Sequence, residues 1–234
     1  MLNILKAVWI LFWAALLTLT LFLPIVIAAL AGRSGNAAFF GTQVYAWCIL
    51  KLTGIRLRVS GREHIDPTQR YVILSNHASY FDPPALVLAL GLQYRWVIKK
   101  ELRKVPLFGL ALETSRNLFI DRARGSDALE SIKRGVAQLP EGTSILIFPE
   151  GTRSWDGQLL PLKKGGFVIA RDGKLPILPV TIRGSHDRLP KGTAAFSPGI
   201  IDIVIHPPVV TAGREVEEVR EEVKGIIEDA LLTE

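Results

Sequence analysis

An uncharged run near the N-terminus places the strongest constraint on what this chain can fold into. No charged residue occurs between Ala7 and Gly32, and most residues of the run are apolar. A helix needs roughly 20 such residues to cross the hydrocarbon core of a bilayer. Trp9 and Trp13 lie near one end of the run, where aromatic side chains favour the membrane interface. Pro24 would kink this helix, which helices in lipid tolerate. The run therefore predicts a helix retained in a membrane.

Two other interpretations of this region are open. Ala29-Leu30-Ala31 resembles a signal-peptidase site, although the apolar run exceeds the roughly 7–15 apolar residues of a signal peptide. A second apolar segment, Ala37–Leu50, follows the turn-forming residues Arg33–Asn36 and is too short to cross easily. Either the first segment spans the bilayer and a short apolar segment follows it, or the two segments form a helical hairpin in one leaflet. One positive charge flanks the run on each side, Lys6 and Arg33, so the charges do not predict which end faces the cytoplasm.

The rest of the chain alternates strand patterns with helix patterns. Strands are predicted at Ile55–Ser60, Tyr71–Leu74, Tyr94–Ile98, Leu118–Ile120, Ser144–Phe148, Ile177–Ile182 and Ile200–Ile205. Helices are predicted at Pro84–Leu90, around Leu107–Leu110, at Ser126–Leu139, at Lys164–Arg171 and from Arg214 onward. This alternation indicates a layered α/β domain around a largely parallel or mixed sheet. We expect an apolar helical membrane anchor over residues 1–52 and an α/β domain over residues 53–234.

Charge is distributed unevenly along the chain, whose net charge is +6. Residues 1–50 hold two basic residues and no acid, and residues 214–234 hold three basic and eight acidic residues. The segment between them therefore carries +9. A basic segment beside an apolar one suits an anionic membrane surface or a phosphorylated substrate. Nucleic acid is not expected as a partner, because the sequence has no basic helix, aromatic–basic repeat or zinc-ligand spacing.

The sequence lacks the motifs of several common classes of functional site. The single cysteine, Cys48, excludes an internal disulfide framework and fits a reducing compartment. The sequence has no Gly-x-Ser-x-Gly elbow, no phosphate-binding Gly-rich loop and no Gly-x-Gly-x-x-Gly fingerprint. It also has no His-Glu-x-x-His motif, so no zinc site is expected.

A histidine and an aspartate lie between a predicted strand and the helix that follows it. Val72–Leu74 is the apolar strand, and Asp82 followed by Pro83 is typical of a helix start. His77 precedes Asp82 by five residues, so the carboxylate can fold back onto the imidazole. The second ring nitrogen would then be free to act as a base. A plainer interpretation is also open, in which Asp82 caps the helix and His77 bonds only to backbone.

A second polar loop, Phe148–Ser154, follows another predicted strand. Gly151 permits unusual backbone angles beside a ligand. Arg153 presents a planar fork that suits phosphate. Glu150 either accepts a hydrogen bond from a substrate hydroxyl or pairs with Arg153.

Basic residues also follow other predicted strands. Lys99 and Lys100 come directly after one strand, Arg122 follows another, and Lys163-Lys164 lies in a loop or at the start of a predicted helix. Sites collect at strand ends in open α/β sheets. Together with the histidine–aspartate pair, these residues predict one rim that binds a phosphorylated molecule.

Four sequence blocks occur in an order that resembles a known family. They are Asn76-His77-x-x-x-x-Asp82, Phe119–Arg122, Phe148–Ser154 and Pro176–Val180. These blocks resemble those of the glycerophospholipid acyltransferases, in particular the bacterial 1-acylglycerol-3-phosphate acyltransferases. The resemblance covers about residues 57–210. One departure is Arg116-Asn117 before the second block, where a glycine is common in the family.

The resemblance implies an enzyme of phospholipid biosynthesis. It would transfer an acyl group from acyl-coenzyme A or acyl carrier protein to the free sn-2 hydroxyl of lysophosphatidic acid, giving phosphatidic acid. His77 would be the general base and Asp82 would orient it, while the thioester is a co-substrate and no metal or bound cofactor is required. Because acceptor and product are lipids, the protein is expected at the cell membrane with its active site facing the cytoplasm.

The same resemblance assigns roles to the remaining polar residues. The phosphate of the acceptor is expected to bind the basic residues Arg153, Lys99, Lys100 and Arg122. The acceptor pocket is expected to include Asn76, Glu150, Gly151 and Thr152. Three alternatives stay open: an acyltransferase for another lysophospholipid or an acylated amino-acid lipid, a catalytically silent membrane lipid-binding module, and a secreted binding protein.

Overall fold

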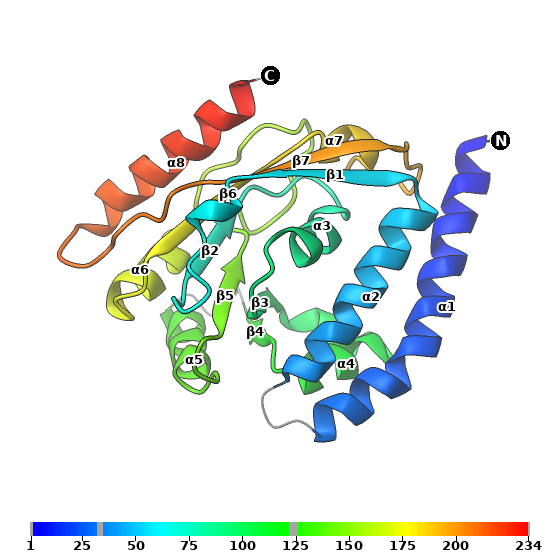
Figure 1. The fold of residues 1–234 in the computed structure, drawn as a ribbon, viewed down its shortest axis with the longest axis horizontal. Helices are drawn as coiled ribbons and strands as arrows, with labels where there is room; N and C mark the ends of the chain where they lie inside the picture. Colours follow the sequence, from blue (N-terminus) through cyan, green and yellow to red (C-terminus); the bar gives the residue numbers. More distant parts are fainter. Residues whose placement is uncertain (1, 32–34, 122–125, 234) are drawn as a thin grey trace.

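The structure, a computed structural model, describes residues 2–31, 35–121 and 126–233. Within these residues a seven-stranded sheet lies between two layers of helices (Figure 1). Its strands lie in the order β1-β7-β6-β2-β5-β3-β4 across the sheet. Their bounds are Ile55–Ser60 (β1), Val72–Ser75 (β2), Tyr94–Lys99 (β3), Leu118–Ile120 (β4), Ser144–Ile147 (β5), Ile177–Arg183 (β6) and Gly199–Ile205 (β7). Each predicted strand is thus confirmed to within one residue at either end.

The direction of the strands defines where a site can form. Every neighbouring pair is parallel except β6 and β7, which are antiparallel. Consequently β6, β2, β5, β3 and β4 all end at the same edge of the sheet, which we call the carboxyl edge. Functional groups of open α/β sheets collect outside this edge. The predicted α/β fold with a largely parallel, mixed sheet is confirmed.

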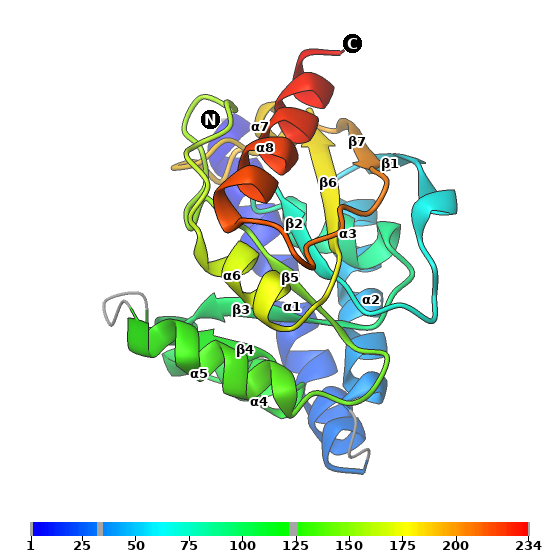
Figure 2. The ribbon, with the colours of Figure 1, turned by 90° about the vertical axis from the view of Figure 1, so that its left-hand side faces the viewer.

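Helices cover both faces of the sheet. One layer contains α1 (Leu2–Ala31), α2 (Asn36–Leu52), α3 (Asp82–Ala89) and α4 (Phe108–Thr114), and the other contains α5 (Ser126–Ala137), α6 (Gly165–Asp172) and α8 (Val216–Leu232). Figure 2 looks onto the second layer, with α1 and α2 behind the sheet. Three short helices, η1 (Arg62–His64), η2 (Lys100–Lys104) and α7 (Ser185–Arg188), lie in the connections.

The two hydrophobic cores follow the alternation of side chains along each strand. In β2, Ile73 packs into the core under α2 and α3, whereas Val72 and Leu74 pack into the core under α5, α6 and α8. All four residues of β2 are buried. This explains why the strand reads as a continuous apolar run rather than as an alternating one.

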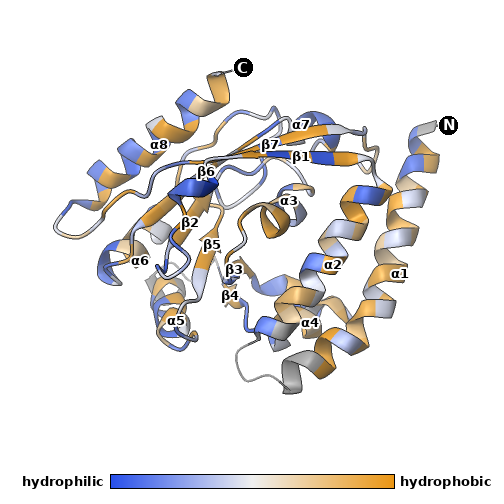
Figure 3. Ribbon diagram, viewed as in Figure 1, coloured by the Kyte–Doolittle hydropathy of each residue, from blue (hydrophilic) through white to orange (hydrophobic). Residues whose placement is uncertain are grey.

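In the N-terminal region α1 packs against α2 as a helical hairpin, and the choice between a span and a one-leaflet arrangement stays a prediction. Residues Asn3–Ile27 are apolar and long enough, by length and composition, to cross a membrane, and Figure 3 shows the hydrophobic colouring of α1. The second helix, α2, buries Phe39, Ala46 and Leu50 in the core that it shares with α3 and the sheet. The boundary predicted at residue 52 coincides with the end of α2, yet α2 packs as part of the α/β domain.

A buried arginine connects the hairpin to the sheet. The Arg95 side chain of β3 is almost completely buried, and its Nη2 donates to Oδ1 of Asn36 at the start of α2, at 2.8 Å. Its Nη1 donates to the carbonyl oxygen of Tyr94, also at 2.8 Å. Burial, together with the nearby positive charge of Arg116, lowers the pKa of Arg95 to about 10. The start of α2 is therefore fixed to β3 by a cation that burial makes costly to leave unpaired.

Arg116, the departure from the family pattern, adopts a left-handed backbone conformation with φ 61°. This is the region in which glycine is unstrained and other residues are not. The position therefore keeps the backbone shape that a glycine provides, although the side chain is an arginine. The charge of Arg116 also opposes that of the buried Arg95.

We predict that Arg116→Gly stabilises the protein. The substitution removes both the left-handed strain and the repulsion of Arg95, and we expect the free energy of unfolding to rise by about 1 kcal/mol. Denaturant unfolding in detergent measures this change. The matched control is Arg134→Gly, which places glycine inside α5 and should destabilise by about 1 kcal/mol. Equal destabilisation by both substitutions would show that the φ of Arg116 carries no strain.

Candidate active site

His77 and Asp82 meet in the connection between β2 and α3. Nδ1 of His77 lies 2.7 Å from Oδ2 of Asp82. The Asp82 side chain is fully buried, and 16% of the His77 side chain is exposed. An ionised carboxylate only accepts hydrogen bonds, so the imidazole carries its hydrogen on Nδ1 when it is neutral. Nε2 then holds a lone pair, which is the arrangement of a general base.

Asp82 organises the loop as well as the histidine. The same oxygen, Oδ2, accepts the backbone N–H groups of Ala78 and Ser79, each at 2.8 Å. Asp82 is the first residue of α3, whose N-cap is Phe81, and its side chain makes no forward capping bond into the helix. The plain interpretation, in which Asp82 only caps the helix, is therefore wrong. Its carboxylate turns back onto residues 77–79 because three donors converge there.

The second polar loop holds the backbone of His77 from both sides. Oε1 of Glu150 accepts the His77 N–H at 2.5 Å. The backbone N–H of Ser154 donates to the His77 carbonyl oxygen at 2.8 Å. The other Glu150 oxygen, Oε2, accepts the N–H of Leu160 at 2.9 Å. These bonds join the loops that follow β2 and β5, which are neighbouring strands of the sheet.

The imidazole of His77 also rests on an aromatic ring. The ring of Phe148 is stacked on it with the ring centroids 3.9 Å apart and an angle of 9° between the planes. Trp96 lies beside Phe148, with 5.8 Å between centroids. The orientation of the histidine ring is thus determined by a carboxylate at its edge and an aromatic ring on its face. A base held this rigidly needs little reorganisation to take a proton.

Glu150 is a positioning residue in this geometry. Burial raises its pKa to about 7, although the two backbone N–H groups that it accepts oppose the rise. The negative charge of Asp82 contributes to the rise. Glu150 was predicted to contact the acceptor or to pair with Arg153. Both of its oxygens bond to backbone groups of the site, and its place in the acceptor pocket stays a prediction.

Arg153 is presented on an aromatic platform. Its guanidinium carbon lies 3.5 Å from the centroid of the Tyr80 ring, which is a cation–π contact. Its Nη1 is buried and has no hydrogen-bond partner among the described residues. Lys191 fixes the backbone next to it, because its Nζ donates to the carbonyl oxygen of Arg153 at 2.7 Å and to Oγ1 of Thr152 at 3.2 Å.

The other predicted acceptor-pocket residues lie in the same loops. Oδ1 of Asn76 accepts the N–H of Ile182 at 2.7 Å, and its Nδ2 donates to the Ile182 carbonyl oxygen at 2.8 Å, so this amide extends the pairing of β2 with β6. Gly151 has φ 73°, and a Cβ there would press on Nζ of Lys163. Thr152 is exposed. The role of these residues in the acceptor pocket stays a prediction.

The remaining predicted phosphate ligands follow β3 and β4. Lys99 ends β3 and is exposed, with Nζ 3.6 Å from Oε1 of Glu101. Lys100 forms an ion pair with Asp121, which follows β4. Arg122 lies outside the described residues. Both lysines therefore have a carboxylate partner, and Lys99 lies at the carboxyl edge with the longer contact of the two.

Three residues that hold the site carried no sequence prediction of their own. They are Tyr80 under Arg153, Phe148 under His77, and Lys191 against the second loop. Tyr80 and Phe148 stand inside the sequence blocks, where an aromatic residue gives a detectable signal. Lys191 follows α7, 38 residues away from Arg153. Nothing in the local sequence indicates its contact, because that contact exists only in the folded chain.

An apolar cavity of about 210 Å³ adjoins the site. It is lined mainly by the apolar residues of β3, β4, β5, α5 and α6. Phe148, Gly151 and Lys163 line the part that belongs to the second polar loop and its sequel. One residue, Phe148, therefore both stacks on His77 and borders the cavity.

Comparison with known proteins places this α/β site in a family. A family model described as Acyltransferase matches residues 56–183, more than half of the chain. The chain belongs to this acyltransferase family, as the ordered blocks predicted. The matched region holds His77, Asp82 and the whole second polar loop.

Relatives and one solved structure agree with this assignment. The chain is 37% identical over 171 residues to "1-acyl-sn-glycerol-3-phosphate acyltransferase alpha" of Mus musculus, covering 72% of this chain and 60% of that protein. It is 34% identical over 195 residues to the "1-acyl-sn-glycerol-3-phosphate acyltransferase" of Limnanthes alba, covering 83% and 68%. The chain therefore spans about three fifths of the mammalian relative. The crystal structure of the 1-acyl-sn-glycerophosphate (LPA) acyltransferase PlsC from Thermotoga maritima is similar, with a TM-score of 0.85, 26% identity, and coverage of 98% of this chain and 94% of that chain.

We predict that Glu150 makes stability depend on pH. Because its pKa is about 7 in the folded protein and ordinarily 4.5, the unfolded chain loses this proton first as the pH rises. The contribution of Glu150 is therefore complete below pH 4.5 and lost by pH 7, on the order of 3 kcal/mol over this window. Denaturant unfolding of wild type and Glu150→Gln between pH 5 and pH 8 measures it. Because glutamine does not titrate, the free energy of unfolding of wild type should fall relative to that of Glu150→Gln as the pH rises, and parallel curves would show that folded Glu150 is ionised throughout.

Proposed function

We propose that this protein is an O-acyltransferase that moves an acyl chain from a thioester to the free sn-2 hydroxyl of lysophosphatidic acid, giving phosphatidic acid. The observation that carries the proposal is the buried Asp82–His77 pair beside Arg153, whose buried Nη1 has no partner among the described residues. The pair supplies a base, and the arginine supplies an anion-binding group a short distance along the same rim. The relatives named above carry this activity in their names.

The base would act on the hydroxyl of the acceptor. Nε2 of His77 takes the hydroxyl proton while the oxygen attacks the thioester carbonyl carbon. The tetrahedral intermediate then breaks its carbon–sulfur bond, and the thiolate takes the proton back from the imidazolium. General-base help of this kind is typically worth ~10²–10⁴-fold in rate. Asp82 stabilises the imidazolium, as the acid of a hydrolase triad does, while the acceptor hydroxyl replaces the serine.

The basic groups at the carboxyl edge would bind the phosphate of the acceptor. Arg153 is the strongest candidate, because Tyr80 covers one face of its guanidinium and its buried Nη1 has no partner in the part of the chain that the structure describes. A buried donor of this kind is costly unless a ligand accepts from it. Lys99 would add a second positive charge from the end of β3. Arg122 remains part of the proposal by resemblance, and Lys100 would contribute only if its pair with Asp121 opened.

The acyl chain would enter the apolar cavity beside Phe148. Phe148, the ring on which His77 is stacked, also lines this cavity, which supports the acyl chain of a thioester near Nε2 lying there. The donor would be acyl-coenzyme A or acyl carrier protein, and no bound cofactor is proposed. The apolar helix α1 indicates association with a membrane, and we propose the cytoplasmic face of the cell membrane, where lipid acceptor and soluble donor meet.

We predict that His77→Gln abolishes acyl transfer without unfolding the protein, because glutamine has no basic nitrogen to take the proton. Thiol release from oleoyl-coenzyme A by purified protein in detergent, with and without lysophosphatidic acid, measures this. The matched control is His206→Gln, because His206 follows β7 at the opposite edge of the sheet and bonds to Thr181. Release should need both acceptor and His77. Retained turnover in His77→Gln would refute the base, and release without acceptor would indicate a thioesterase.

We predict that Arg153→Ala chiefly raises the KM for the phosphorylated acceptor. Loss of a charge-assisted contact should raise KM roughly 10- to 100-fold and leave kcat within a few-fold. A matched panel of lysophosphatidic acid and monoacylglycerol measures the specificity of this loss. Arg56→Ala is the control, because Arg56 is an exposed residue of β1. An equal loss with both acceptors would remove the phosphate role from Arg153.

A further inference from the structure

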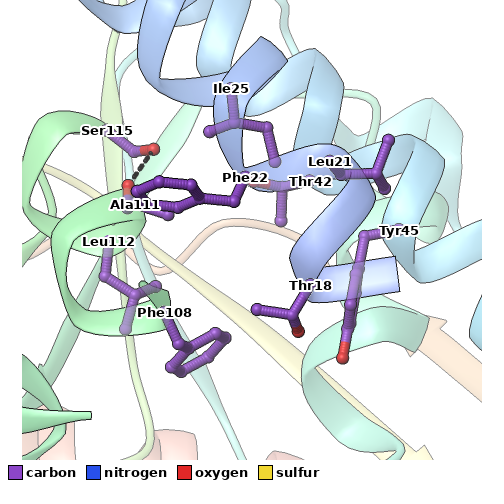
Figure 4. A pocket seen from close by; sticks show the side chains of 10 residues that line it. All are labelled: Thr18, Leu21, Phe22, Ile25, Thr42, Tyr45, Phe108, Ala111, Leu112 and Ser115. Carbon is purple, nitrogen blue, oxygen red and sulfur yellow. Dashed lines mark hydrogen bonds between the residues drawn. The ribbon is translucent and has the colours of Figure 1, made fainter. Parts of the chain in front are cut away.

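The segment that follows Lys99 connects the proposed phosphate rim to the N-terminal helix. Lys99 ends β3, η2 begins at Lys100, and α4 comes next along the chain. The inner side of α4 packs against α1, and the two helices together with α2 line a small cavity of about 70 Å³ (Figure 4). Phe108, Leu112 and Ser115 face Phe22 and other side chains of the hairpin there. The position of α4 is therefore fixed relative to α1.

The outer side of this segment is apolar and exposed. Four large apolar side chains, each between 38% and 47% exposed, project from η2 and α4: Leu102, Val105, Leu107 and Leu110. On α1, the exposed side chains of Leu19 and Leu23 lie in the stretch that packs against α4. Contiguous exposed apolar side chains on a folded protein mark an interaction surface. Exposed apolar side chains are thus present on two elements, α1 and α4, that pack against each other.

Basic residues accompany these apolar side chains. Residues 99–104 contain four basic residues and one acid, so the segment carries a charge of +3. All six are exposed. Apolar side chains flanked by lysine and arginine are the composition of surfaces that lie in the interface of an anionic membrane. An acidic protein partner would explain the charge, but it would not explain why exposed apolar side chains accompany that charge on an element that packs against the apolar helix α1.

The backbone holds these side chains outward. Leu107, directly before α4, has φ 60°, a left-handed conformation that is strained for leucine. Gly109 packs so closely that a Cβ there would collide with the carbonyl oxygen of Arg103. Arg103 in turn forms an ion pair with Glu113 of α4. The segment is thus a braced unit and not a loose loop whose leucines happen to be exposed.

We propose that η2 and α4 form a second membrane-contacting surface, which rests on the same anionic bilayer leaflet as α1. Leu102, Val105, Leu107 and Leu110 enter the interface, and Lys104 lies among the lipid headgroups. Under the proposed function, this contact keeps Lys99 and the rim at headgroup height, so a lipid acceptor reaches His77 without leaving its leaflet. The contact itself does not depend on that function.

Site-specific fluorescence tests the contact in the full chain. In a Cys48→Ser background, Leu110→Cys and Val105→Cys are each labelled with an environment-sensitive nitrobenzoxadiazole group. The matched control is Val210→Cys, which is exposed and precedes α8 in the opposite helical layer. Each protein is reconstituted into vesicles of equal parts phosphatidylglycerol and phosphatidylcholine, with and without doxyl-labelled lipid. Labels at 105 and 110 should shift to the blue and lose at least half of their emission to doxyl lipid, and the label at 210 should do neither.

The outcomes are distinguishable. Labels at 105 and 110 that are as solvent-exposed as the one at 210 would overturn the proposal. A blue shift without quenching by doxyl lipid would also overturn it, because a second protein copy would then cover the surface. A blue shift that appears only when acyl carrier protein is added would assign the surface to that partner instead. Each result is read without any enzymatic turnover, so it stands even if the proposed acyl transfer fails.

Activity provides an independent measurement. Val105→Asp should raise the mole fraction of lysophosphatidic acid needed for half-maximal rate in vesicles roughly tenfold, since about 1.4 kcal/mol of interfacial contact corresponds to this factor. The rate with a short-chain, monomeric lysophosphatidate should be unchanged. Equal loss in both assays would show that Val105 acts on the fold and not on the membrane.

Discussion

The burial of one carboxylate determines the shape of the site. Asp82 is fully buried, and a single oxygen of its side chain receives the imidazole of His77 and two backbone N–H groups. A buried charge is tolerated only when donors surround it, so the loop after β2 must close tightly around Asp82. Since α3 begins at Asp82, the same requirement sets the position of this helix on the sheet. The base, the loop and the helix start are therefore one structural unit.

A second unit, the loop after β5, makes that arrangement rigid. Its carboxylate, Glu150, bonds to the N–H of His77, and its backbone at Ser154 bonds to the carbonyl oxygen of the same residue. The side chain of Arg153 leaves this loop two residues after the glycine at 151. Tyr80 packs against its guanidinium, and Lys191 donates to its backbone carbonyl oxygen. Base and anion-binding group are consequently positioned by one loop, so their separation is set by covalent geometry and backbone bonds. Preorganisation of this kind lowers the cost of bringing reactants together.

Sequence patterns revealed most of the fold and only part of the site. The strands were predictable because buried strands are apolar runs between turn residues, and Asp82 with His77 was predictable because five residues span one turn. The bond between Glu150 and the His77 N–H was not, because it depends on β2 and β5 lying side by side. The sequence also did not predict that α2 belongs both to the hairpin and to the core under the sheet. An apolar helix has the same sequence pattern whether lipid or protein covers it. Arg116 shows the reverse case, in which a residue other than glycine adopts a positive φ that its sequence does not indicate.

The membrane-associated part and the catalytic part share one frame. Because α2 contributes to the core under the sheet and Arg95 ties its start to β3, no flexible linker separates the hairpin from the strand that ends at Lys99. The hydrogen bond from Trp9 to the carbonyl oxygen of Leu52 joins the two helices at their other end. The exposed face of α1 therefore has a fixed height relative to the carboxyl edge of the sheet. In such a frame the depth of the site at a membrane is determined by packing, and under the proposed function a lipid acceptor would meet His77 at a distance that the fold itself sets.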